Sequence, residues 1–298
     1  MFSLQLIQDF ITVAIAISIE ALPFVVLGVL IATFVQHAMS LPKLLSRLPK
    51  NPLLRRLILA FTGVLFPVCE CGNVPVARTL LTAGLKPHEV VTFLLAAPIL
   101  NPVVFLTTRE AFARVSPEMV WLRMVAGLVI ALLVGFLVSF KKDQNAVLEH
   151  SFYRQVCEPT PVVRGSAFTR AVAFFQSEFL TIMQSVVVGS AIAAAIQAFV
   201  PREAIVSIGS NGTLSVVAMT VLAFVVSICS SVDAFFALSF ASTMPIGALL
   251  AFLVFGPMMD IKMFTLLRST FKTRYVVVLA LFLALLAFLV GVITNAWA

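Results

Sequence analysis

Apolar segments of about 20 residues recur along this 298-residue chain, and they constrain its fold more than any other feature. A helix of that length crosses the roughly 30 Å hydrocarbon core of a bilayer. Hydrophobic residues make up 61% of the chain and charged residues only 11%, which leaves no room for a separate soluble domain. We therefore expect an all-α, multi-pass membrane protein with the lipid bilayer as its surroundings. Basic residues cluster between the apolar segments without interleaved aromatic residues, so we expect no nucleic-acid partner.

One apolar segment, residues 57–84, is interrupted by Phe66-Pro67-Val68-Cys69-Glu70-Cys71-Gly72-Asn73-Val74-Pro75. Backbone breaks at membrane depth are tolerated only where protein buries them or a water-filled cavity receives them. An ionisable group within the membrane is a functional candidate by default. The interruption therefore predicts the centre of a translocation site.

The second part of the chain repeats the first. Residues 1–140 form the first membrane repeat, 141–170 a polar linker, and 171–298 the second repeat. Cys69 then corresponds to Cys229, and Asn101 to Asp260, with an offset that drifts only slightly along the matches. Ordered matches of this kind indicate internal duplication.

Two topologies fit the apolar pattern. Eight plain transmembrane helices would place the basic stretches 41–56 and 141–170 on opposite sides, although each carries five Lys or Arg residues. The positive-inside rule puts both in the cytoplasm. If residues 57–84 and 213–242 are re-entrant helical hairpins, each repeat has three transmembrane helices plus one broken hairpin, and the repeats are inverted, which is a common transporter plan. We favour the inverted repeats in a cell's inner (cytoplasmic) membrane, and keep the eight plain helices as the alternative.

Both hairpin tips would then meet near the membrane midplane. We expect Asn73 and one of Ser230 and Ser231 to cap helices there, which would point two positive helix ends at one spot. Adjacent thiols select soft species over hard ions. The predicted substrate-binding residues are Cys69, Glu70, Cys71, Asn73, Cys229, Ser230, Ser231, Asp233, Asn101 and Asp260, and the thiols of Cys69, Cys71 and Cys229 are the predicted ligands of a soft metal or metalloid.

Further charged residues within apolar segments include Glu20, Arg78 and Lys262. Glu20 precedes Pro23 by three residues and is either a proton relay or a buried hydrogen-bond partner. Lys262 either pairs with Asp260 or extends towards the membrane surface, and we favour the second. We expect no enzymatic activity, catalytic residue or cofactor. The chain also lacks a Gly-x-x-x-x-Gly-Lys-Ser/Thr motif, so ATP hydrolysis is not indicated.

The motifs around Cys69 and Asn101 resemble those of the predicted permease family that includes the ArsP-type organoarsenical efflux permeases. The resemblance is carried by residues 67–75 and 97–102, and in the second half by 229–235 and 255–260. It implies a membrane permease that exports trivalent methylated arsenicals, with Cys69 and Cys71 at the binding site, and it leaves a homo-oligomer possible.

Three other functions stay open. The substrate could instead be a soft metal ion or a small sulfur-containing anion. The alternative from another class is a membrane thiol oxidoreductase that uses Cys69 and Cys71.

Overall fold

A computed structural model describes residues 2–38, 49, 51–65, 69–140, 145–157, 166–199 and 212–297. These residues are almost entirely helical, and the only β-structure among them is an isolated bridge between Leu148 and Phe271. In the first half the helices are α1 (Phe2–Ala38), α3 (Pro52–Leu65), α4 (Glu70–Thr82), α5 (Pro87–Ala96), α6 (Pro102–Phe112) and α7 (Met119–Ser139). After α8 (His150–Cys157), the second half contains α9 (Ala167–Phe199), α11 (Gly212–Val226), α12 (Asp233–Leu238), α13 (Ile246–Met258), α14 (Ile261–Arg268) and α15 (Thr273–Trp297).

The protein is a polytopic helical membrane protein. Within the described residues, five segments are long and apolar enough to cross a bilayer: Ile7–His37, Met119–Ser139, Phe168–Gln197, Ile246–Arg268 and Thr273–Trp297. Many large apolar side chains of four of these segments are exposed, as expected where the surroundings are lipid, whereas Ile246–Arg268 is mostly buried inside the protein. The expected all-α, multi-pass fold is confirmed.

The interrupted segment folds as two short helices. α3 has 14 residues and α4 has 13, so at 1.5 Å per residue each is about 20 Å long, too short to cross the roughly 30 Å core alone. The matching pair in the second half is less even, because α11 has 15 residues but α12 only six, followed by turns up to Pro245. Pro67 lies outside the described residues. A re-entrant path for both pairs stays a prediction.

The apolar segment 90–108 does not form one continuous helix. Residues 97–101 form a turn between α5 and α6. Pro98 and Pro102 explain it, because proline lacks a donor N–H and also disfavours helical geometry in the residue before it. A corresponding break separates α13 from α14, where Met259 and Asp260 have extended backbone. Each half therefore contains a discontinuous helix at the matching position.

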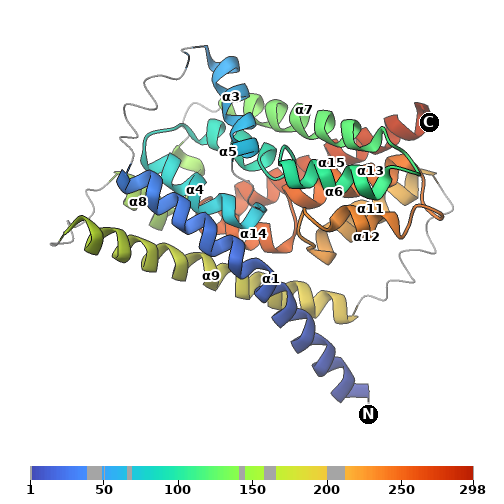
Figure 1. The fold of residues 1–298 in the computed structure, drawn as a ribbon, viewed down its shortest axis with the longest axis horizontal. Helices are drawn as coiled ribbons and strands as arrows, with labels where there is room; N and C mark the ends of the chain where they lie inside the picture. Colours follow the sequence, from blue (N-terminus) through green and yellow to red (C-terminus); the bar gives the residue numbers. More distant parts are fainter. Residues whose placement is uncertain are drawn as a thin grey trace.

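The helix order of the first half recurs in the second. α5 packs on α3 and α7, just as α13 packs on α11 and α15. Across the halves, α1 packs along α9, α4 contacts α14, and α12 contacts α6. In Figure 1, α1 runs from the N-terminus at the lower right towards the left, whereas α9 starts on the left and runs to the right. This opposite direction is what inverted repeats require, although the inversion itself stays a prediction.

Part of the predicted linker packs onto the helical body. The backbone N–H of Lys272 donates to Val147 O (2.9 Å), and that of Glu149 donates to Thr270 O (2.9 Å). Leu148 and Phe152 are buried against the same region. Residues 145–157 therefore cover the turn between α14 and α15 instead of only connecting the halves.

The side of the membrane on which this region lies can be tested with Cys157. Because we predict 141–170 to be cytoplasmic, a membrane-impermeant maleimide should leave Cys157 unmodified in intact cells and modify it in inside-out vesicles. Cys69, Cys71 and Cys229 are buried, so they should contribute little labelling. The Cys157→Ser variant provides the background. Labelling of intact cells that depends on Cys157 would contradict the inverted-repeat topology.

Candidate functional site

Matching turns precede α4 and α12. The carbonyl of Cys69 accepts hydrogen bonds from the N–H groups of Gly72 (3.1 Å) and Asn73 (3.3 Å). The carbonyl of Cys229 accepts from Val232 (3.0 Å) and Asp233 (3.1 Å), the residues at the equivalent positions. Each turn presents a cysteine at the start of a helix, and the two turns come from different halves of the chain.

The predicted helix caps need correction. Cys69, with extended backbone, precedes the first turn of α4, so Asn73 lies inside the helix. Val232 occupies the cap position of α12, which rules out Ser230 and Ser231 as caps. The carbonyl-centred turns begin these helices without a side-chain acceptor, so the usual preference for Asn and Ser at helix starts does not decide their boundaries.

Three buried thiols meet at these turns. Cys69, Cys71 and Cys229 are free cysteines with exposed fractions of 4%, 1% and 2%. Cys69 and Cys71 flank Glu70 in the chain, and the Cys229 thiol lies 3.9 Å from the Oε2 atom of Glu70. One ligand atom from each of Cys69, Glu70 and Cys71 lies within 4.8 Å of the other two. The structure therefore brings together the three cysteines that the sequence analysis selected.

Glu70 links these thiols to polar groups from the second half. Its Oε2 atom accepts a hydrogen bond from the Ser230 hydroxyl (3.3 Å) and faces the Cys229 thiol at 3.9 Å. Its Oε1 atom lies 3.5 Å from the Lys262 ammonium. The half-buried Ser231 donates to the Cys229 sulfur at 3.6 Å. A single carboxylate is thus shared between the thiol group and a cation.

Lys262 does not extend towards the membrane surface. Its side chain is only 2% exposed, and its Nζ atom also lies 3.9 Å from Asp260 Oδ2. The preference for an extended lysine is therefore wrong, because the buried carboxylates of Glu70 and Asp260 draw the ammonium inward. The contact between Lys262 and Glu70 could not be predicted from the sequence, because the two residues lie far apart in the chain and meet only where α4 packs against α14.

Asn101 and Asp260 both cap the helices that follow the two breaks. Asn101 Oδ1 accepts from Val103 N (2.9 Å), and Asp260 Oδ1 accepts from Met263 N (2.6 Å). Both side chains are buried. Asp260 keeps its second oxygen directed to Lys262, so it joins the thiol cluster, whereas the hydrogen bond observed for Asn101 Oδ1 is the cap of α6.

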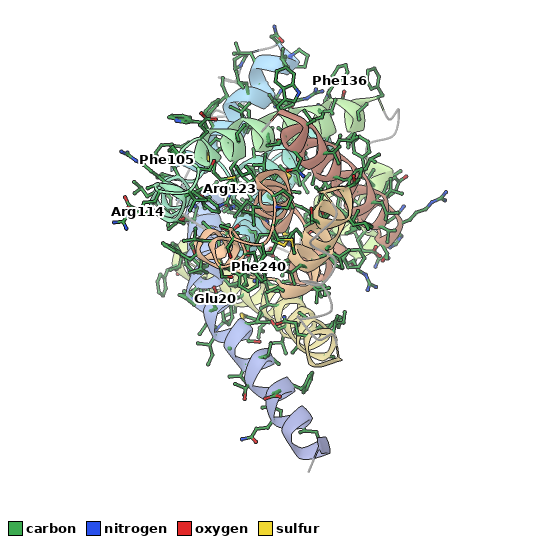
Figure 2. All side chains as sticks on the ribbon, turned by 90° about the vertical axis from the view of Figure 1, so that its right-hand side faces the viewer. Glu20, Phe105, Arg114, Arg123, Phe136 and Phe240 are labelled. Atoms are coloured by element: carbon green, nitrogen blue, oxygen red, sulfur yellow. The ribbon has the colours of Figure 1, made fainter. Side chains whose placement is uncertain are left out.

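Asp233 is bound by an arginine that the sequence analysis did not select. Arg123, on α7, donates from Nη1 and Nη2 to the two carboxylate oxygens at 3.0 and 2.5 Å, and its Nη1 also donates to the Thr108 hydroxyl at 2.7 Å. Figure 2 shows Arg123 inside the helical body, whereas Arg114 points outward from its edge. The sequence contained one indication of this role, because Arg123 is the single arginine within the apolar segment 120–140.

A second buried ion pair lies further along α4. Arg78 donates to Glu178 of α9 at 2.5 Å and to the carbonyl of Ser269 at 3.1 Å, and its guanidinium stacks over Phe152 at 4.4 Å. The pair connects the first half, the second half and the predicted linker. Sequence analysis noted Arg78 within an apolar segment but missed Glu178.

Asn73 and Glu20 lie beside the cluster. Asn73 is fully buried, and its amide has no hydrogen-bond partner within the described residues. It stands three residues after Glu70, so both occupy the same face of α4. Glu20 is half-buried on α1 and interacts electrostatically with Lys262 and Glu70. Figure 2 places it below the centre of the body, on the long N-terminal helix.

Comparison with known proteins identifies relatives along nearly the whole chain. The model of the ArsP_1 family, described as "Predicted permease", matches residues 6–296. The UPF0718 protein YcgR of Bacillus subtilis (strain 168) is 37% identical over 278 residues, which cover 92% of this chain and 93% of that protein. A protein of Streptococcus mutans serotype c (strain ATCC 700610 / UA159), described as a two-component membrane permease complex subunit, is 33% identical over 264 residues, covering 88% and 86%. No solved structure matches.

The thiol cluster predicts a specific cross-link. Mild oxidation should join Cys229 to Cys69 or Cys71, because the Cys229 thiol lies 3.9 Å from Glu70 Oε2 and a carboxylate oxygen of Glu70 lies within 4.8 Å of both other sulfurs. Mass spectrometry of a non-reduced tryptic digest should detect the linked peptides, and a bound thiophilic solute should protect against their formation. Cys157→Ser should leave the cross-link intact. If the only product joins Cys69 to Cys71, the contact between the halves is wrong.

The Arg123–Asp233 pair predicts a characteristic pattern of stability. Arg123→Met should lower the free energy of unfolding by about 3–5 kcal/mol, because it leaves a buried carboxylate without its partner. The double variant Arg123→Met with Asp233→Asn should recover most of that loss. Thermal unfolding of the purified protein in detergent measures both, and Arg114→Met at the exposed edge is the matched control. A double variant as unstable as the single one would contradict this account.

Proposed function

We propose, for this chain that belongs to the family described as "Predicted permease", that it is a secondary transporter that exports a soft, thiophilic solute across the cytoplasmic membrane. Trivalent methylated arsenicals are the first candidate. The observation that carries the proposal is the cluster of three free thiols, from both halves of the chain, around the buried carboxylate of Glu70. Because the cluster is buried among apolar residues, it suits a solute that has lost its hydration shell.

The chemistry of the thiols suits trivalent arsenic. Thiolate sulfur is a soft ligand, and it prefers soft acceptors to hard ions. A thiol and an arsenic-bound hydroxyl exchange to form an As–S bond and water, so the thiol proton leaves with the hydroxyl and no net charge moves. With the three thiols gathered around Glu70, an arsenical can transfer between Cys69, Cys71 and Cys229 by repeated exchange. Such exchange permits binding without trapping the solute.

Helix breaks supply the route. The turn before α4, the turn before α12 and the two breaks at Asn101 and Asp260 leave backbone groups outside regular helices. Broken helices from paired repeats form the central sites of many secondary transporters. Glu20, half-buried and electrostatically linked to Glu70, is our candidate for a proton relay that couples transport to a proton gradient.

The alternatives differ in how they use the thiols. A soft metal ion or a small sulfur-containing anion remains a possible substrate of the same site. A membrane thiol oxidoreductase is disfavoured because a redox partner needs accessible thiols, whereas these three are almost completely buried. Since one relative is described as a subunit of a two-component permease complex, a second membrane subunit is a candidate partner alongside a homo-oligomer.

Loss of the thiols should abolish transport. We expect Cys69→Ser with Cys71→Ser to reduce export of a trivalent methylated arsenical to background, with membrane levels near normal, since serine oxygen is a poor ligand for soft acceptors. Cell growth and accumulation over a panel of arsenicals, soft metal ions and sulfur anions would measure this, with Cys157→Ser as the control. Wild-type export by the double variant would show that the thiols are structural.

A further inference from the structure

We propose that the ammonium of Lys262 is a specificity element that excludes metal cations from the thiol site while admitting neutral trivalent arsenicals. This inference rests on the proposed function and names which thiophilic species the site accepts. It assigns a role in selectivity to a buried residue whose ion contacts also connect the two halves of the chain.

Lys262 stands where a cation would otherwise bind. Its Nζ atom lies 3.5 Å from Glu70 Oε1 and 3.9 Å from Asp260 Oδ2, both longer than an ordinary charged hydrogen bond of about 2.8 Å. Those two oxygens have no hydrogen-bond partner within the described residues. The ammonium therefore sits between two carboxylate oxygens that are directed to it but do not bind it closely.

Without the ammonium, these groups would form a mixed metal site. The thiols of Cys69 and Cys71 and a carboxylate oxygen of Glu70 lie within 4.8 Å of one another, which suits ligands of one ion. Lys262 is also within electrostatic range of the thiols of Cys71 and Cys229. A metal cation held by this set would meet the ammonium a few ångströms away, in a region of low dielectric where repulsion is strong.

A neutral arsenical avoids that repulsion. Each As–S bond forms as the thiol proton leaves with an arsenic-bound hydroxyl as water, so no cation accumulates beside Lys262. The carboxylates are not needed as ligands, because soft arsenic prefers sulfur to carboxylate oxygen. The same ammonium therefore repels one class of thiophilic solute and is neutral towards the other.

The position of Lys262 in α14 is unfavourable for the helix itself. Asp260 caps the helix, so the lysine lies in the first turn, where the helix dipole disfavours positive charge. α9 packs closely against this turn, since a Cβ atom on Gly189 would approach Lys262 Cα to 3.0 Å. The fold thus holds the Lys262 ammonium at a helix position that disfavours positive charge. At this position the ammonium faces the two carboxylates and the thiol site.

Binding measurements on the purified full-length protein in detergent test this inference. The probes are Cd²⁺ and phenylarsine oxide, a neutral trivalent arsenical. Lys262→Met should lower the Kd for Cd²⁺ by at least about tenfold and change the Kd for phenylarsine oxide by less than about threefold, because only the charged probe is repelled by the ammonium. Lys272→Met removes an exposed lysine just beyond α14 and should change neither Kd.

Two further variants keep the test decisive if Lys262→Met folds poorly. Lys262→Met with Asp260→Asn preserves the net charge of the cluster, and asparagine keeps the helix cap, so its Kd for Cd²⁺ should still fall. Lys262→Arg keeps a cation in place and should continue to exclude Cd²⁺. Added Cd²⁺ should also raise the melting temperature of the methionine variant more than that of the wild type.

The outcomes separate this inference from the proposed function. If the wild type fails to bind phenylarsine oxide through Cys69 and Cys71, the proposed function is wrong. If the wild type binds it but the lysine variants bind Cd²⁺ no better than the wild type, the role of Lys262 alone is overturned. Improved Cd²⁺ binding with unchanged arsenical binding supports both.

Discussion

Burying charge inside a membrane protein is costly unless an opposite charge is close, and the contact of Lys262 with Glu70 and Asp260 meets that requirement at the centre of this fold. It joins α4 of the first half to α14 of the second. Cys69 and Cys71 flank Glu70, and the Cys229 thiol faces the same carboxylate at 3.9 Å, so the charges that connect the halves also position the candidate site. Moving the two halves apart would leave both the ion contacts and the thiol cluster incomplete.

Two other buried ion pairs strengthen the connection between the halves. Arg123 binds Asp233 from α7 to α12, and Arg78 binds Glu178 from α4 to α9. Their loss would leave unpaired charges in an apolar body, at a cost of about 3–5 kcal/mol for each pair. Conformational change in this protein must therefore either preserve these pairs as rigid contacts or replace them with solvent and new partners.

The matching turns explain how one architecture supplies a site from two halves. In each, the carbonyl of a cysteine accepts two N–H groups from the start of the following helix, and the thiol is left beside the other half. The breaks at Asn101 and Asp260 show the same duplication. The halves differ in their polar partners, however, since Asn73 has none among the described residues, whereas Asp233 binds Arg123.

The sequence by itself determined the features that depend on neighbouring residues or on a repeated sequence pattern. Long apolar segments specify membrane-crossing helices, the Cys69–Cys71 motif marks a helix break, and the repeat pairs Cys69 with Cys229 and Asn101 with Asp260. Only the tertiary structure decided which distant charges meet. Lys262 and Arg123 each gain partners from other helices, so their roles cannot be read from neighbouring residues. Hydrophobic burial acts residue by residue, whereas pairing of buried charges depends on how the helices pack.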